Sequence, residues 1–256
     1  MSNKKEREKR REERIAAESK ADTGDRRTRL LQIGAGAVFV AIIAVVVVIV
    51  IAGSSSSSGG DAENLVEIKQ VDSLVTGIPQ QKLVLGDNKA PVELIEYGDL
   101  QCPVCKEYSE EFLPAIVEKQ VKNGEAKIIF RNFPIISEES IPAGQAAIAA
   151  GAQGRGWNFI ELFYRNQGEE RSGYVTEEFL EAIAKGAGVK DMAKFNQERK
   201  GKATKEEVTR TNEQAETFGF TGTPSFAIKG PSSNGTELLG TPATVEEFEE
   251  AIEKAS

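Results

Sequence analysis

The chain has 256 residues, of which 32 are basic and 40 acidic, so its formal net charge at pH 7 is −8. Residues 1–29 hold 11 of the basic residues, which leaves 21 basic and 33 acidic residues for the rest. An acidic main part argues against nucleic-acid binding. With no histidine and only two cysteines, the chain cannot form a four-ligand structural zinc site by itself.

An uncharged apolar segment, residues 30–52, follows the charged tail 1–29. As a helix it would extend about 35 Å, against roughly 30 Å of bilayer hydrocarbon. We therefore expect one transmembrane helix here; the alternative is a cleaved signal peptide, whose apolar stretch is usually about 7–15 residues. Arg26, Arg27 and Arg29 lie beside the span, and positive flanks stay in the cytoplasm. The pattern predicts a single-pass cell-membrane protein with a cytoplasmic N-terminus and an extracytoplasmic main part.

Residues 53–80 are expected to be a flexible linker and lead-in segment, because they begin with a run of Gly and Ser. After this segment, residues 82–85 and 92–97 are typical of strands. A helix is predicted from Pro103 to about residue 122, with a break at Pro114. Residues 127–133 form the next predicted strand. Strand, helix and strand at this spacing predict a βαβ unit with parallel strands.

The second half of the chain is mostly helical in pattern. Helices are predicted at 143–152, 157–165, 176–185 and 206–218, strands at 225–229 and 236–239, and a last helix after the capping box Thr244-x-x-Glu247. One aromatic and aliphatic group recurs at helical spacing and is predicted to be core: Trp157, Phe159, Ile160, Phe163 and Tyr164. The pattern indicates an α/β domain at 81–256 with an all-helical insert at about 138–210.

The two cysteines form one C-x-x-C motif, Cys102-Pro103-Val104-Cys105, behind the strand 92–97. Pro103 suits the first position of a helix. Cys102 would then lie at the helix N-terminus, where the dipole and free N–H groups stabilise a thiolate. Cys102 is therefore the predicted attacking cysteine, and Cys105, one turn further, the resolving one. The alternative is an inert staple, although closing so short a loop removes little chain entropy.

Three stretches resemble the DsbA-like thiol-disulfide oxidoreductases of the thioredoxin superfamily. Residues 96–105 (EYGDLQCPVC) are similar to the family's segment from strand to active site, residues 220–226 (FTGTPSF) to its cis-proline loop, and residues 145–157 to its helical insertion. The resemblance implies a thioredoxin-like fold with an all-helical insertion. It also implies a cis bond between Thr223 and Pro224, which would present a backbone edge to a substrate strand.

The resemblance further implies that Glu96 is a buried acid beneath the two cysteines. A buried carboxyl would have a raised pKa and could relay a proton to or from Cys105. The alternative is a solvated glutamate at a sheet edge. Pro103 and Val104 are expected to tune the active site. Val104 stands where related proteins often have a histidine cation. The absence of this cation predicts a weaker oxidant.

The expected function is a membrane-tethered oxidase that donates the Cys102–Cys105 disulfide to cysteine-containing secreted or surface proteins. An oxidising compartment suits such a catalytic disulfide. A membrane redox partner is expected to recycle the cysteine pair, and no motif calls for a metal, nucleotide or flavin cofactor. Two alternatives remain: a tethered disulfide reductase or isomerase, and a peptide-binding or chaperone module that does not use its thiols.

Overall fold

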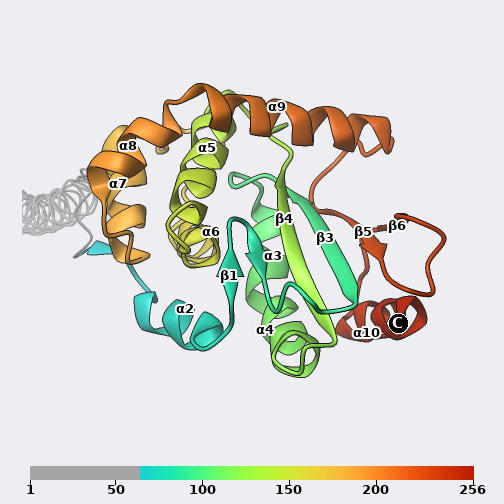
Figure 1. The fold of residues 1–256 in the computed structure, drawn as a ribbon. Coiled ribbons are helices and arrows are strands. Elements are labelled where there is room, and N and C mark those ends of the chain that lie inside the picture. The colour runs from blue at the N-terminus through green and yellow to red at the C-terminus, as the bar shows by residue number, and fades with distance from the viewer. Residues whose placement is uncertain (1–63) are drawn as a thin grey trace, which may run out of the picture. The chain divides into compact units, whose positions relative to one another are not determined.

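The computed structural model describes residues 64–256, so the predicted charged tail and membrane span lie outside the described residues. Within residues 64–256, no helix has the length and apolar character needed to cross a membrane. The centre of this part is a six-stranded sheet with the strand order β1-β2-β4-β3-β5-β6 (Figure 1).

Three central strands of the sheet position the site. β3 (Val92–Gly98) and β4 (Ala126–Asn132) are parallel, with Leu94 opposite Ile128, as the βαβ pattern predicts. β5 (Ser225–Lys229) pairs with β3 in the antiparallel direction. The interior of β3 is almost wholly buried, as expected for a strand covered on both faces.

Alternation along β3 assigns its side chains to two different apolar clusters. Leu94 belongs to the main core cluster, whereas Ile95 and Tyr97 belong to a smaller cluster with Ala215. Because successive side chains of a strand point to opposite faces, Glu96 lies on the face of Leu94. Glu96 therefore faces the main core, to which both cysteines also belong.

The edges of the sheet are short. β1 (Gln80–Gln81) and β2 (Val84–Leu85) form a small hairpin where one strand was predicted at 82–85, and Lys82 takes a left-handed φ of 54° in its turn. The opposite edge is β6 (Glu237–Gly240), close to the strand predicted at 236–239, and it pairs with β5.

The helix after the cysteines is broken close to the predicted position. α3 (Pro103–Glu111) has Phe112 as its C-cap, and α4 (Leu113–Ile116) and one π-helical turn (Val117–Val121) follow. Pro114 has no N–H to donate, and its ring would clash with the carbonyl of Glu110 in a continuous helix. The proline thus explains the break.

The helical insert contains five helices: α5 (Ser140–Gly151), α6 (Gly156–Arg165), α7 (Glu177–Gly186), α8 (Met192–Arg199) and α9 (Lys202–Thr217). All five residues of the predicted aromatic and aliphatic group are buried on α6. Thr176 caps α7 by accepting a hydrogen bond from the Phe179 N–H. No apolar stripe predicts α8, because only Phe195 and Arg199 of this helix are buried.

Two further helices complete the fold (Figure 1). α2 (Ile68–Val75) lies in the segment 53–80, which the sequence suggested was linker and lead-in, but it buries Val71 and Val75 and packs against α6. α10 (Val245–Ala255) begins at Thr244, whose hydroxyl accepts a hydrogen bond from the Glu247 N–H. Phe248 is buried on this helix.

Candidate active site

Cys102 occupies the N-cap position of α3, with Pro103 as the first helical residue, as the sequence predicts. The Cys102 Sγ accepts a hydrogen bond from the Cys105 N–H, with 3.4 Å between the two atoms. The pKa of Cys102 is lowered to about 6, first by the hydrogen bond from the Cys105 thiol, and burial opposes this shift. A helix N-terminus stabilises a thiolate in the same direction. Cys102 is therefore mostly a thiolate at neutral pH.

Cys105 has the opposite electrostatics. Its side chain is fully buried, whereas that of Cys102 is 4% exposed. Burial raises the pKa of Cys105 well above its usual range, and the hydrogen bond to Cys102 and the charges of Cys102 and Glu96 add to the shift. The two cysteines are not joined by a disulfide in this structure. Cys102 can thus act as the nucleophile or the leaving group of a disulfide exchange, whereas Cys105 keeps its proton.

The loop before β5, which contains Thr223 and Pro224, lies beside the cysteines although it is distant from them in the sequence. The Thr223–Pro224 peptide bond is cis, as the family resemblance implies. The Cys102 thiol donates a hydrogen bond of 3.3 Å to the carbonyl oxygen of Thr223. Because β5 pairs with β3, the sheet itself brings this loop beside the end of β3 where the cysteines follow.

Glu96 lies within the core and not at a solvated edge, since its side chain is only 8% exposed. Burial raises the pKa of Glu96 to about 8, and the charges of Glu161 and Cys102 contribute further. A cavity of about 20 Å³ adjoins it, lined among others by Tyr108 and Ser109 of α3. A carboxyl with this pKa can carry a proton at neutral pH.

Asp99, in the loop before Cys102, ties two active-site loops together. Its Oδ1 accepts a hydrogen bond from the Gln101 N–H, and its Oδ2 accepts from Ile135 and Ile136, each at 2.8 Å. Its backbone carbonyl also accepts from the Cys102 N–H. No pattern in the sequence indicated that Asp99 is buried and bonded in this way.

The helical insert also holds the cysteine turn, which sequence reasoning missed. Gln167, in the loop between α6 and α7, donates from its Nε2 to the carbonyl oxygens of Leu100 (2.7 Å) and Cys102 (3.2 Å). In the same loop, the Arg171 N–H donates to Gln101 Oε1 at 3.1 Å. A glutamine in a polar loop has no sequence pattern that would have revealed this role.

The two middle residues of the motif, Pro103 and Val104, are exposed, and Val104 is 43% accessible. It adds no charge next to the Cys102 sulfur. The low pKa of Cys102 therefore comes from hydrogen bonds and the helix N-terminus.

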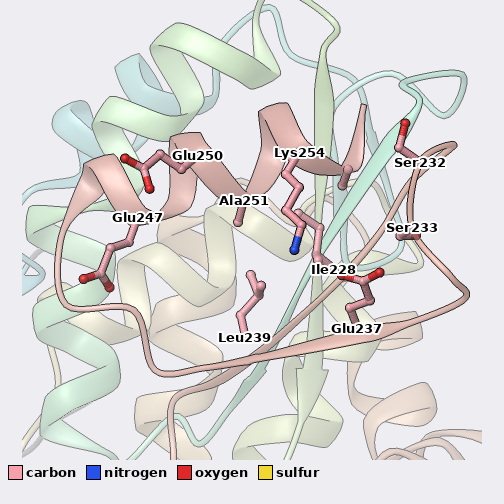
Figure 2. Close-up of a pocket in the computed structure, with 10 residues that line it drawn as sticks. Ile228, Ser232, Ser233, Glu237, Leu239, Glu247, Glu250, Ala251 and Lys254 are labelled. Atoms are coloured by element: carbon pink, nitrogen blue, oxygen red, sulfur yellow. The ribbon is translucent and has the colours of Figure 1, made fainter.

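A separate cleft of about 270 Å³ lies between α10 and β6 (Figure 2). Its lining includes Leu239, Glu250 and Lys254, and neither cysteine is among the lining residues. We place the candidate active site at the cysteines, where perturbed titratable groups converge.

These features define a dithiol protein with a thioredoxin-like fold. The thioredoxin family model matches residues 79–254, so the chain belongs to the thioredoxin family. The chain is 31% identical over 153 residues to the probable disulfide bond formation protein D of Bacillus cereus. The aligned region covers 59% of this chain and 71% of that protein. The Bacillus anthracis protein of the same name is 32% identical over 154 residues, or 59% and 70% of the two chains.

A solved structure agrees with this assignment. The crystal structure of oxidised BdbD from Bacillus subtilis matches with a TM-score of 0.61 at 23% identity, over 71% of this chain and 97% of that one. This likeness concerns the fold. Together with the Bacillus relatives, it supports a thiol-disulfide oxidoreductase of the DsbA type.

Proposed function

We propose that the protein is a membrane-anchored, extracytoplasmic oxidase that donates the Cys102–Cys105 disulfide to cysteine-containing secreted or surface proteins. The observation that carries the proposal is the difference between the two cysteines. The pKa of Cys102 is about 6 and that of Cys105 is well above the usual range. The Bacillus relatives are named for disulfide bond formation, which supports the same direction.

The reaction begins with attack of a substrate thiolate on the Cys102 sulfur of the enzyme disulfide. The Cys102–Cys105 bond breaks, a mixed disulfide forms on Cys102, and Cys105 leaves as a thiolate. Since its environment disfavours charge, Cys105 takes a proton, and the protonated Glu96 carboxyl is the proposed donor. Glu96 thus acts as the general acid of this step.

In the second step, another substrate thiolate attacks the substrate sulfur of the mixed disulfide. The substrate disulfide forms, and Cys102 leaves as a thiolate. A leaving thiol with a lower pKa departs faster, so the pKa of about 6 favours this step. Two electrons have then passed from the substrate to the enzyme, which a membrane redox partner must reoxidise.

The Thr223 carbonyl gives the substrate a place to bind. It lies 3.3 Å from the Cys102 sulfur and belongs to the backbone before β5. An extended substrate segment that pairs with this edge would bring its own sulfur to Cys102. Thr223 and Pro224 are therefore the proposed substrate-binding residues.

A reductase or isomerase is the second candidate, because Val104 places no cation beside Cys102. The shift of the Cys102 pKa from 9.0 to about 6 favours the reduced form at pH 7 by about tenfold, or about 30 mV. The pKa of the attacking cysteine is about 7 in thioredoxin and about 3.5 in DsbA. The value here, about 6, lies between them.

The reduction potential of the full-length protein in glutathione buffers tests the direction. An oxidase requires a potential well above the value of about −270 mV that is typical of thioredoxin. A potential at the thioredoxin value, together with reduced cysteines in cells, would assign the protein as a reductase or isomerase. Cys102→Ser is the control, because without the attacking cysteine the protein cannot form the Cys102–Cys105 disulfide or exchange it.

The proposed membrane location rests on the apolar segment 30–52 and its basic flank. The chain offers a direct test, because Cys102 and Cys105 are its only cysteines. After mild reduction, a membrane-impermeant thiol reagent should label the protein in intact cells, and Cys102→Ser should lose most of the label. Labelling only after the membrane has been permeabilised would place the domain in the cytoplasm.

A further inference from the structure

A second buried acid, Glu161 on α6, has no part in the two-step reaction. Its side chain is fully buried. Its Oε2 accepts a hydrogen bond of 2.8 Å from the Ser109 hydroxyl and lies 3.5 Å from the Arg165 guanidinium. Its Oε1 has no hydrogen-bond partner within residues 64–256. A buried carboxylate oxygen without a partner is costly, which calls for an explanation.

Ser109 connects this acid to the site. Its side chain binds Glu161, and Ser109 also lines the cavity of about 20 Å³ that adjoins Glu96. One water molecule needs about 10–15 Å³ and two or more polar partners. Glu96 and Ser109 supply them, while most of the other lining side chains are apolar. A single water here would bridge the Glu96 carboxyl and the Ser109 hydroxyl.

We propose that Glu161 exchanges a proton with Glu96 through the Ser109 hydroxyl and one water molecule in this cavity. The exchange reloads Glu96 after it has protonated Cys105. The inference rests on the proposed role of Glu96 as the acid of the first step. Glu161 acts through Glu96 and never touches the reacting sulfurs, so it is a positioning residue.

Both acids lie in surroundings that raise their pKa values, so both can hold a proton near neutral pH. Burial raises the pKa of Glu161 to about 7, Arg165 and the Ser109 hydrogen bond oppose the rise, and Glu110 adds to it. The pKa of Glu96 is about 8, with Glu161 and Cys102 as the charges that raise it. The groups that face the pair are Cys102, Cys105 and Glu110 from α3, Tyr164 and Arg165 from α6, and Glu67, which pairs with Arg165.

Protonated Glu96 gives its proton to the Cys105 thiolate and becomes a carboxylate. Protonated Glu161 then donates to the Ser109 oxygen, Ser109 passes its own hydrogen to the water, and the water protonates Glu96. Glu161 is left as a carboxylate beside Arg165, which stabilises it. No electron moves in this sequence, and no bond other than those to hydrogen changes.

Infrared difference spectra between oxidised and reduced full-length protein test the inference, because they report protonated carboxyl groups directly. In the wild type we expect the signal of protonated Glu161 to disappear on reduction and that of Glu96 to shift; Glu161→Gln should remove the first signal, and Glu96→Gln should remove both, because Glu161 then has no acceptor. Glu110→Gln is the matched control: it removes a half-exposed glutamate that also pairs with Arg165, and both signals should remain.

Ser109→Ala keeps both acids and changes little volume, so it tests the route even if Glu161→Gln disturbs folding. Reprotonation of Glu96 after one turnover should slow by at least about tenfold, since a positioned proton donor typically contributes more than that. An unchanged rate would overturn the route. If Glu96→Gln removes a signal but Glu161→Gln removes none, the inference about Glu161 fails and the proposed function stands. If Glu96→Gln removes none, the proposed role of Glu96 fails too.

Discussion

The Cys102 sulfur donates a hydrogen bond to the carbonyl oxygen of Thr223, a residue 121 positions further along the chain. The attacking atom and the proposed substrate edge are thus in direct contact. The reactive sulfur therefore lies at the place where a bound substrate segment would present its own. The site depends on this contact and on the hydrogen bonds within the C-x-x-C turn.

The reactivity of Cys102 should depend on Cys105. Cys105→Ala removes the hydrogen bond that contributes most to the low pKa of Cys102, so this pKa should rise from about 6 toward its usual range. The ultraviolet absorbance of the thiolate, followed against pH in the reduced protein, measures the change. Val104→Ala, which leaves all backbone donors in place, should keep the pKa near 6. An unshifted titration in Cys105→Ala would contradict the assignment.

Glu96→Gln should stabilise the reduced protein at neutral and alkaline pH. The pKa of Glu96 is about 8 in the folded state against 4.5 ordinarily, so its contribution is fully present below pH 4.5 and is lost as the pH rises through 8. Glutamine removes this loss, and we expect a gain of about 3 kcal/mol in unfolding free energy at pH 7 and almost none at pH 4.

Urea denaturation at the two pH values measures the effect. Glu93→Gln, on the same strand but half-exposed and paired with Lys127 at 3.2 Å, is the control and should change stability by less than about 1 kcal/mol. Equal effects of Glu96→Gln at both pH values would show that Glu96 is not titrating in this range.

Gln167→Ala should raise the pKa of Cys102 as well as weaken the fold. The lost hydrogen bonds to Leu100 and Cys102 each contribute about 1 kcal/mol. Gln153→Ala is the matched control. This glutamine likewise joins two segments by side-chain hydrogen bonds, but its partner is the backbone of Asp191 and not the cysteine turn. Both variants should lose similar stability, and only Gln167→Ala should slow alkylation of Cys102 at pH 6.

Asp99→Ala should damage both stability and exchange activity. The carboxylate accepts three backbone hydrogen bonds within a buried loop, and its loss leaves these N–H groups unpaired. We expect a decrease of about 3 kcal/mol or more in unfolding free energy. Thermal unfolding together with the rate of disulfide exchange measures the effect, and wild-type values for both would show that the loops hold together without Asp99.

The parts of the fold with strong local signals could be predicted. β3 and β4 have apolar centres, Leu94-Ile95 and Ile128-Ile129-Phe130, and Pro103 marks the start of α3 and so the N-cap position of Cys102. The cis-proline loop followed from the family resemblance. By contrast, α8 has no apolar stripe, and α2 lies next to a linker-like sequence.

The supporting residues of the site could not be predicted for a different reason. Gln167 and Glu161 act through single hydrogen bonds across long sequence distances. Such contacts depend on how the insert packs against α3, which neither periodicity nor spacing encodes. Glu96 was recognised only because it precedes the cysteines at a position that the family resemblance marks.

The contact between Cys102 and Thr223 also has a consequence for biosynthesis. At about 5–20 residues per second, the ribosome takes roughly 6–24 s to extend the chain from one residue to the other. During this interval the nascent chain carries two cysteines without the loop that positions a substrate. Until β5 and β6 have been synthesised and paired, the two thiols of the nascent chain are therefore exposed to cross-linking with other nascent chains.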